Sequence, residues 1–366
     1  MKKCVIASDS FKGTLSSKEI ADLFESEFKK SFPHAQLEKV VLGDGGENTL
    51  EVFANNFPNG QYHHLEVTGP NFQKVNAKYF TYDDNAVIEL AEASGLGLAT
   101  EHNPMKTTTF GVGELIFDAY LHSFRHFYIA LGGSSTTDGG CGLLSALGIR
   151  FINRLGEDFI PTGGTLSDIV EIDDSDLTVK DAHFTILSDV QNPMYGEKGA
   201  AKVFARQKGA NDEEIELLDQ NLKYLSSLFK KDISNIPGTG AAGATSAGML
   251  AYLDAEIVSG IDTILDIINF DSIIKDADYV FTGEGKLDSQ SFDGKLISGV
   301  LKHTKGISTI CVCGKVENDI PKEQFYAIYP TSNGEEDFAT IKKNAKENYR
   351  KTIIKVFDCL SKTNTQ

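Results

Sequence analysis

The chain has 366 residues, of which 41% are hydrophobic and 24% are charged, an ordinary composition for a globular protein. This length can build a large hydrophobic core and suggests two domains rather than one. The formal net charge of −17 argues against non-specific binding to nucleic acid and to anionic membrane surfaces, because both need a positive protein field.

Cysteine usage and hydropathy indicate the compartment. The five cysteines are scattered except for Cys311 and Cys313, so they predict no disulfide framework and suit a reducing cytosol. The first apolar run stops at Asp9, which is too short for a signal-peptide core. The nearly uncharged stretch 237–253 is too short to span a membrane. We therefore expect a soluble, cytoplasmic protein without nucleic-acid or membrane partners, whose oligomeric state stays open, with a homodimer as one option.

The first thirty residues set a pattern that recurs along the chain. The apolar run 4–7 predicts a buried strand, and a polar loop follows it. Ser16 and Glu19 then have the spacing of a helix capping box, and apolar residues recur at helical spacing as far as Phe28. We expect a strand, a loop and a helix in that order.

Similar apolar runs, each followed by a loop rich in glycine or polar residues, occur at residues 40–42, 127–131, 185–188, 279–282 and 309–313. Buried strands that alternate with helices predict an α/β fold with largely parallel sheets. Ligands of such folds bind beyond the carboxyl ends of the strands, which is where the polar residues of interest fall. Residues 68–71 form a strong turn signal and a candidate domain boundary, and the spacing of apolar residues over 338–360 predicts one long amphipathic helix.

The segment 132–142 carries five glycines, four hydroxyl residues and Asp138 between a predicted strand and a helix. Glycines let backbone N–H groups approach an anion, and a helix N-terminus adds a positive dipole end. We interpret the segment as a phosphate-binding loop. A tight strand-to-helix turn is the alternative.

Residues 238–243 match the pattern G-x-G-x-x-G of dinucleotide-binding loops. The preceding segment 217–230 is helical in pattern, however, and no acidic residue follows at the expected distance on a second strand. A second anion-binding loop, or close helix packing through small residues, explains the pattern better.

Other familiar signatures are missing from the sequence. It contains no Walker-type phosphate loop, no protein-kinase motif and no H-E-x-x-H zinc motif. His122 and His126 have helical spacing but no third ligand, and Cys311 and Cys313 are interpreted as core thiols on a strand.

Several charged residues lie in the loops beyond the predicted strands. The carboxylates could hold Mg²⁺ or accept a hydroxyl proton, and the lysines could neutralise a phosphate or a substrate carboxylate. These residues are Asp9, Asp44, Glu47, Asp138, Asp189, Glu284 and Asp288, with Lys12, Lys286 and Lys295.

Taken together, these loops resemble those of the type I glycerate kinase family. Eight segments occur in family order over about residues 3–315. They are 7–15, 44–47, 107–114, 132–140, 189–193, 207–210, 237–243 and 282–288. Five residues depart from the family pattern: proline is usual where Ser8 stands, alanine where Gly43 stands, a second glycine where Asn48 stands and asparagine where Thr137 stands, and arginine is commoner at the position of Lys286.

The resemblance implies ATP-dependent phosphorylation of D-glycerate with Mg²⁺. It also implies two α/β domains with largely parallel sheets around a central cleft. The first, Rossmann-like domain would be discontinuous, with residues 1–70 and 265–366. The inserted second domain, residues 71–264, would carry the phosphate loop.

Chemistry distributes the roles among the matching residues. We expect Asp189, Lys12 and Lys286 to be catalytic, with Asp189 as the base or the group that orients the hydroxyl. The expected ATP contacts are Gly132, Gly133, Ser134, Ser135, Thr136, Asp138 and Asn192. The expected glycerate contacts are Ser10, Lys12, Asp44, Glu284 and Asp288, and the expected Mg²⁺ ligands are Asp9, Asp44 and Glu284.

The favoured product is 2-phosphoglycerate, with 3-phosphoglycerate as the alternative. A nicotinamide-dependent oxidoreductase of hydroxy acids, based on residues 238–243, is a second alternative. A non-catalytic sensor on a kinase scaffold is the third, and the charged loop residues argue against it.

Overall fold

A computed structural model describes residues 1–11, 13–46, 48–233, 236–292, 295–332 and 336–363. The chain divides into two compact units, which we call unit 1 (Met1–Asp44 with Ile261–Gln366) and unit 2 (Gly45–Gly260). One unit is discontinuous and the other is inserted in it. The crossing predicted at residue 70 lies instead between Asp44 and Gly45, and the return predicted at residue 265 lies between Gly260 and Ile261.

Unit 1 is built on a sheet of five parallel strands in the order β16-β14-β12-β1-β2. Their bounds are β1 (Lys3–Ser8), β2 (Gln36–Val41), β12 (Tyr279–Thr282), β14 (Ser308–Cys313) and β16 (Ala327–Pro330). A small parallel pair, β13 (Lys286–Leu287) and β15 (Lys315–Val316), stands apart from this sheet. The strand order is that of flavodoxin-like folds, and the connections turn in opposite directions on either side of the β1–β12 pair.

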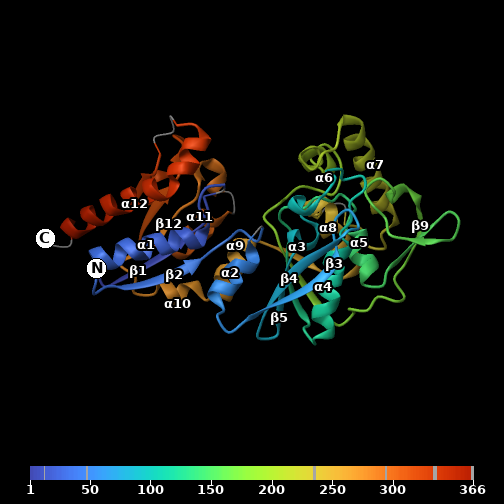
Figure 1. Ribbon diagram of the computed structural model, residues 1–366, viewed down its shortest axis with the longest axis horizontal. Helices are drawn as coiled ribbons and strands as arrows, with labels where there is room; N and C mark the ends of the chain where they lie inside the picture. The colour runs from blue at the N-terminus through green and yellow to red at the C-terminus, as the bar shows by residue number, and fades with distance from the viewer. Residues whose placement is uncertain (12, 47, 234–235, 293–294, 333–335, 364–366) are drawn as a thin grey trace. The chain divides into compact units, whose positions relative to one another are not determined.

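The helices of unit 1 cover both faces of its sheet (Figure 1). They are α1 (Ser17–Ser31), α9 (Gly260–Ile267), α10 (Phe270–Ile274), α11 (Leu296–His303) and α12 (Phe338–Thr363), with the short 3₁₀ turns η4 (Ser289–Phe292) and η5 (Lys322–Gln324). Strand β14 shows the alternation that this needs: Ile310 and Val312 face the α1 and α12 side, whereas Cys311 and Cys313 pack with Ile297 of α11.

Helices α1 and α12 are joined by an aromatic cluster. The Phe357 ring on α12 packs edge-on against Phe24 at 5.1 Å and against Phe28 at 5.7 Å between ring centroids. It also meets Phe281 of β12 at 6.0 Å. The predicted capping box at the start of α1 is confirmed, since the Glu19 N–H donates to Ser16 Oγ at 3.1 Å and the Ser16 N–H donates to the Glu19 carboxylate at 3.0 Å.

Unit 2 contains a six-stranded sheet in the order β11-β10-β6-β5-β4-β3. Its strands are β3 (Gln61–Thr68), β4 (Lys74–Tyr82), β5 (Asn85–Glu89), β6 (His126–Ala130), β10 (His183–Leu187) and β11 (Glu256–Val258). The pairs from β5 to β11 are parallel, and β3, β4 and β5 are antiparallel neighbours. The turn at residues 68–71 therefore closes a β3–β4 hairpin inside this sheet, which explains why the unit boundary lies earlier in the chain.

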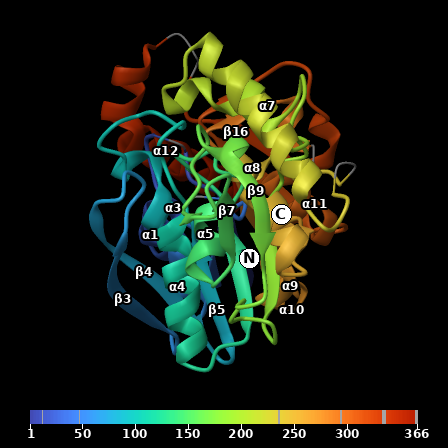
Figure 2. The ribbon, with the colours of Figure 1, turned by 90° about the vertical axis from the view of Figure 1, so that its right-hand side faces the viewer.

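The remaining elements of unit 2 pack on this sheet or beside it. They are α2 (Thr49–Asn56), α3 (Ala91–Ser94), η1 (Leu96–Leu98), α4 (Phe110–Leu121), α5 (Cys141–Ala146), η2 (Leu166–Asp168), α6 (Ala200–Phe204), η3 (Arg206–Lys208), α7 (Asp212–Leu228) and α8 (Ala241–Tyr252), with a three-stranded sheet of β7 (Arg150–Asn153), β8 (Asp158–Phe159) and β9 (Ile169–Asp173). Figure 2 shows α4 along one face of the sheet with α5 beside it. On α2, the Phe53 ring packs at a tilt against Tyr82 and stacks on Tyr128.

The expected α/β class with mostly parallel sheets is thus confirmed, and the predicted C-terminal helix is α12. Within the described part of the chain, no helix combines the length and apolar character needed to cross a bilayer.

Replacing Phe357 by alanine tests the aromatic cluster. The side chain is fully buried, so Phe357→Ala should lower the free energy of unfolding by about 3–5 kcal/mol. Ile354→Ala is the control on the same helix, because Ile354 is 39% exposed and its loss should stay below about 1 kcal/mol. Urea unfolding followed by circular dichroism gives both values, and equal losses would contradict the cluster's role.

Candidate functional site

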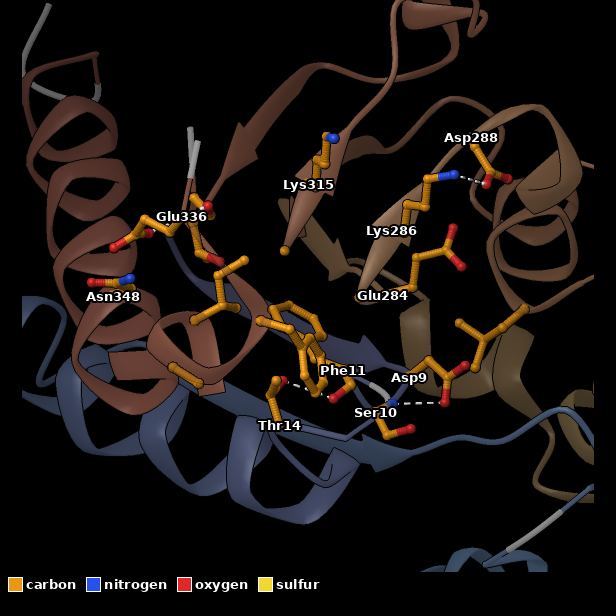
Figure 3. Close-up of a pocket in the computed structure, with 18 of the residues that line it drawn as sticks. Asp9, Ser10, Phe11, Thr14, Glu284, Lys286, Asp288, Lys315, Glu336 and Asn348 are labelled. Carbon is orange, nitrogen blue, oxygen red and sulfur yellow. Dashed lines mark hydrogen bonds and ion pairs between the residues drawn. The ribbon is translucent and has the colours of Figure 1, made fainter. Parts of the chain in front are cut away.

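A pocket of about 560 Å³ opens at the carboxyl edge of the unit 1 sheet, beside the paired strands β1 and β12, where the connections turn in opposite directions. This is the position at which flavodoxin-like sheets bind ligands, and the volume lies in the range of small-molecule sites. Loops that follow all five strands contribute to its wall, together with α12 (Figure 3). The polar wall residues include Asp9, Ser10, Thr14, Asp44, Glu284, Lys286, Asp288, Lys295, Lys315, Glu336 and Asn348.

The loops after β1 and β12 are held together by backbone contacts. The Asp9 N–H donates to the Gly283 carbonyl at 2.9 Å, and Ser8 Oγ donates to the same oxygen at 3.0 Å. A Cβ on Gly283 would lie 1.8 Å from the Val312 carbonyl oxygen, so only glycine permits this approach. The Asp9 carboxylate in turn accepts the Ser10 N–H at 2.6 Å. This part of the pocket is therefore built before any ligand arrives.

Glu284 is the carboxylate with the least satisfied environment in the pocket. Its Oε1 is buried and has no hydrogen-bond partner within the described residues. Burial, together with the neighbouring charges of Asp9 and Asp288, raises the pKa of Glu284 to about 7, and this value includes lowering contributions from Ser291 and Lys295. A cation or a proton donor in the pocket would satisfy this oxygen.

The carboxylates Asp9, Asp44 and Glu284 were predicted as Mg²⁺ ligands, and they line the same pocket. Their oxygens suit Mg²⁺, which commonly uses only one or two protein carboxylates together with water and substrate phosphates. The orphaned Glu284 Oε1 fits such a role. Among the described side chains, no three acidic, histidine or cysteine residues are grouped as a preformed metal centre.

The lysines of the pocket differ in how far they are engaged. Lys286 Nζ lies 3.1 Å from Asp288 and 2.7 Å from Glu317, and these partners raise its pKa. Lys295 donates to Gln290 Oε1 at 3.2 Å, and Lys315, the first residue of β15, lines the pocket (Figure 3). Lys12 lies outside the described residues. Lys315 was not predicted as a site residue, although its position directly after a strand end could have indicated it.

One wall of the pocket is apolar. Phe11 comes from the loop after β1, while Phe338, Ile341 and Ala345 come from α12, with Asn348 one turn further on. The last four have the spacing of one helical face. The sequence pattern predicted this helix but gave no sign that its first turns line a ligand pocket instead of the core.

In unit 2, the glycine-rich segment follows β6 as predicted. Gly133 has φ of +66°, a backbone conformation that favours glycine. Ser135 fixes the middle of the loop, since both its N–H and its hydroxyl donate to the Ser94 carbonyl at 2.9 and 2.8 Å. The Thr107 hydroxyl donates to the Ser135 carbonyl at 3.0 Å. The loop is therefore fastened to the segment around α3 and to the start of α4.

Asp138 is a fully buried anchor of this loop. Its carboxylate accepts hydrogen bonds from the Thr109 N–H and hydroxyl, both at 2.8 Å, and from the N–H groups of Gly140 and Gly142, both at 3.2 Å. Burial raises the pKa of the Asp138 carboxyl, and these hydrogen bonds oppose the shift. The geometry supports a structural role for Asp138, whereas the sequence suggested a contact with ATP.

The other side chains of the loop that were predicted to contact ATP are also largely buried. Ser134, Ser135, Thr136 and Thr137 are buried, and Ser134 Oγ accepts a hydrogen bond from Lys208. Within the described structure, the Thr136 and Thr137 hydroxyl oxygens have no hydrogen-bond partner. Gly132 and Gly133 are the half-buried residues of the loop, so an anion would meet backbone there rather than hydroxyl groups.

Lys208 is a residue of this region that the sequence did not indicate as a site residue. Its ammonium group is buried and donates to Ser134 Oγ at 2.8 Å and to the Thr136 carbonyl at 2.6 Å. A lysine two residues after Arg206 in a polar stretch is typical of a surface position. Only the family-like segment 207–210 drew attention to it.

The second glycine-rich segment packs against the first. A Cβ on Gly243 would lie 2.0 Å from the Thr136 carbonyl oxygen, and the Gly139 N–H donates to the Gly243 carbonyl at 3.1 Å. Ala242, Gly243 and Ala244 all have positive φ. No strand lies between α7 and Gly238 in the described residues there. These contacts favour the close-packing explanation of the G-x-G-x-x-G pattern over a dinucleotide loop.

Asp189 and Asn192 lie in the loop after β10, at the same carboxyl edge of the unit 2 sheet. Asp189 Oδ1 accepts the Gly260 N–H at 3.2 Å. Asn192 donates through its amide to the Lys198 carbonyl at 2.8 Å, and its own carbonyl accepts the Gly240 N–H at 2.9 Å. The predicted site residues that the structure describes therefore form two groups, one in the unit 1 pocket and one at the carboxyl edge of the unit 2 sheet.

Comparison with known proteins adds independent information. The profile of the glycerate kinase family matches residues 4–361. The chain belongs to the glycerate kinase family. A glycerate kinase of Bacillus cereus is 40% identical over 365 residues, with 96% of each chain covered. Glycerate 2-kinase of Escherichia coli is 39% identical over 330 residues, with 87% of this chain and 86% of that one covered.

The fold agrees with this membership. A crystal structure of a Salmonella typhimurium LT2 protein, provisionally named glycerate kinase 2, is 36% identical and has a TM-score of 0.87, with the whole of both chains covered. The resemblance inferred from the loops is therefore confirmed, as is the expectation of an enzyme of the glycerate kinase class. Family membership also implies ATP as the phosphoryl donor.

The anchoring role of Asp138 can be tested directly. Asp138→Asn replaces an acceptor oxygen by an NH₂ group among N–H donors, so it should lower the free energy of unfolding by about 2–4 kcal/mol. Asp254→Asn is the matched control, because the Asp254 side chain is 94% exposed in its ion pair with Lys231 and such pairs contribute less than about 1 kcal/mol. Urea unfolding compares the two variants. An Asp138→Asn protein as stable as the control would contradict the anchor.

Proposed function

We propose that the protein phosphorylates the C2 hydroxyl of D-glycerate with ATP and Mg²⁺ to give 2-phosphoglycerate and ADP, as a cytoplasmic enzyme. The observation that carries this proposal is the unit 1 pocket at the carboxyl ends of β1 and β12, which combines carboxylates with lysines. A small hydroxy acid with one carboxylate needs local cations in a chain of net charge −17. A kinase of this class also needs oxygen ligands for a metal.

We assign glycerate to the polar wall of this pocket. Ser10 and Asp288 would contact its hydroxyl groups, and the lysines would hold its carboxylate. Lys286 already has two carboxylate partners, so Lys295 and Lys315 join Lys12 and Lys286 as candidates for this contact. Asp9, Asp44 and Glu284 would hold Mg²⁺ directly or through water. When bound, Mg²⁺ supplies positive charge that neutralises the phosphoryl oxygens.

The glycine-rich loop of unit 2 is assigned to the phosphates of ATP. Gly132 and Gly133 can present backbone N–H groups, and the N-terminus of α5 follows the loop. Asp138 and the buried hydroxyls support the shape of the loop. Asn192 would hold the neighbouring turn in place through its two hydrogen bonds.

Asp189 is the proposed base. As the hydroxyl oxygen bonds to the γ-phosphorus, its proton passes to the Asp189 carboxylate while the bond from phosphorus to the ADP oxygen breaks. Catalysis then depends mainly on positioning and charge neutralisation.

The C2 hydroxyl is favoured over the C3 hydroxyl by a torsional argument. A clamp on the carboxylate leaves one rotatable bond fewer before the C2 oxygen than before the C3 oxygen. More of the bound population would then be in an attack geometry. The Escherichia coli relative is named glycerate 2-kinase, and this name indicates the same oxygen in that protein.

The variant Asp189→Asn tests the proposed base. Asparagine keeps the Oδ1 acceptor for the Gly260 N–H, so the fold should persist while kcat falls by about 10²-fold or more. Gln191→Ala in the same loop serves as the control, because Gln191 is exposed, and it should keep nearly full turnover. Steady-state ADP release measures both. Normal turnover by folded Asp189→Asn would remove Asp189 from this role.

The identity of the product tests the proposed function as a whole. The purified protein is incubated with ATP, Mg²⁺ and D-glycerate, and the mixture is analysed by phosphorus NMR before any mutase is added. We expect the 2-phosphate to dominate and its formation to stop when the metal is chelated. A spectrum dominated by 3-phosphoglycerate would overturn the torsional argument alone, and the absence of any phosphoglycerate would overturn the proposed activity.

A further inference from the structure

The buried lysine behind the glycine-rich loop is in an unusual electrostatic position. Lys208 is 2% exposed. Among the described residues, its ammonium group forms no ion pair within 4 Å. Its two bonds go to neutral oxygens, Ser134 Oγ and the Thr136 carbonyl. A buried cation without a contacting anion is held at a high free energy. The protonated form of Lys208 therefore lowers the stability of unit 2, because no carboxylate among the described residues contacts its ammonium group.

The backbone keeps this lysine in place. The Lys208 N–H donates to the Ala205 carbonyl at 3.0 Å, and Gly209 follows with φ of +102°. A Cβ on Gly209 would lie 1.9 Å from the His102 carbonyl oxygen. The turn is thus pressed against the neighbouring segment, and the Lys208 side chain lies buried beside it.

The charged groups around Lys208 leave its ammonium poorly compensated. Asp138 is the nearest acidic influence, yet its carboxylate is occupied by four donors around α4 and α5. The neighbouring segments also carry Glu101, His102 and Lys106, Lys202 and Arg206, and Asp212, Glu213 and Glu214, and each of these is at least partly exposed. Desolvation accordingly lowers the pKa of Lys208 to about 7, against a smaller opposing effect of Asp138.

We propose that Lys208 is a positioning residue that supplies the buried positive charge of the phosphate loop, so that binding of nucleotide phosphates is coupled to protonation of its ammonium group. This inference rests on the proposed assignment of the loop to ATP. An anion on the loop favours the charged form of a nearby lysine. Protonated Lys208 in turn holds Ser134 and the Thr136 carbonyl, while the half-buried Gly132 and Gly133 would meet the phosphates.

The sign of the coupling follows from the order of the two pKa values. In the free protein at pH 8, a group with a pKa of about 7 is mostly neutral. Bound phosphate raises that pKa, so binding takes up a proton. Affinity should therefore decrease as the pH rises above about 7, for as long as the bound form remains protonated.

Calorimetric titration of the whole protein with adenylyl imidodiphosphate and Mg²⁺ tests the coupling. Titrations at pH 8 in two buffers of different ionisation enthalpy give the number of protons taken up. We expect about 0.5–1 proton more for wild type than for Lys208→Arg, whose guanidinium stays charged. The same comparison removes the contribution of the nucleotide itself.

The pH profile of affinity gives a second readout. Between pH 7 and 8.5, the Kd of wild type should rise about 5–10-fold, whereas that of Lys208→Arg should stay within about 2-fold. Lys208→Met should bind at least about 10-fold more weakly than wild type at pH 7, and this gap should narrow as the pH rises. A purely structural lysine would give a gap that does not change with pH. Lys223→Met, an exposed lysine on α7, should match wild type throughout.

The outcomes separate this inference from the proposed function. Equal proton uptake and parallel pH profiles in wild type and Lys208→Arg would overturn the role of Lys208. If neither Lys208 variant folds, proton uptake by wild type decides, because an uptake no larger than that of the nucleotide in its own titration overturns the coupling. Gly133→Val should abolish binding to the loop. If that variant keeps normal affinity, the assignment of the loop to ATP fails, and the inference fails with it.

Discussion

The Asp138 carboxylate accepts hydrogen bonds at the first turns of two helices, α4 through Thr109 and α5 through Gly140 and Gly142. Both helix N-termini present unsatisfied N–H groups and positive dipole ends. One buried carboxylate therefore fixes the angle at which α4, α5 and the glycine-rich loop meet. The loop contacts to Ser94, Thr107, Lys208 and Gly243 all depend on that arrangement.

The two units differ in how the carboxyl edge of the sheet is built. In unit 1, the strand order itself opens a hollow beside β1 and β12, and charged side chains then line it. In unit 2, the corresponding sheet edge is filled by backbone, because glycines at residues 139, 140 and 243 allow loops and helices to approach within contact of one another. Charged side chains thus line the sheet edge in unit 1, whereas closely packed main chain forms it in unit 2, with the buried Lys208 in contact with the loop.

The strands and the loops after them could be predicted because their signals are local: β-branched runs, glycine and aspartate in the loops, and the capping box at Ser16. The boundary between the units could not be predicted, because the sequence signal of the turn at residues 68–71 is the same whether the turn closes a hairpin or marks the end of a domain. Which sheet a strand joins is settled by contacts far away in sequence, such as β3 with β4 and β4 with β5.

The candidate site shows the same division. Strand-end residues such as Asp9 and Glu284 were predicted, because parallel strands bring their carboxyl ends to one edge. Lys208 was missed, because composition assigns lysines to the surface and only three-dimensional packing reveals a buried one. The inward role of Asp138 was missed for a related reason, since a loop sequence does not indicate whether its carboxylate faces a ligand or the protein's own N–H groups.

The discontinuity of unit 1 has a consequence for synthesis on the ribosome. Strand β1 pairs with β12, and Cys4 is opposite Tyr279. This side of the sheet can therefore form only after Tyr279 has been synthesised. Unit 2 is complete at Gly260 and can fold while β1, α1 and β2 are still without most of their partners. The folded insert then holds the ends of that long chain segment close together, so the entropy of closing a loop of more than two hundred residues is largely lost before the last strands emerge. The half-built sheet of unit 1, with the β1 edge unpaired, is therefore the part of the nascent chain most exposed to mispairing.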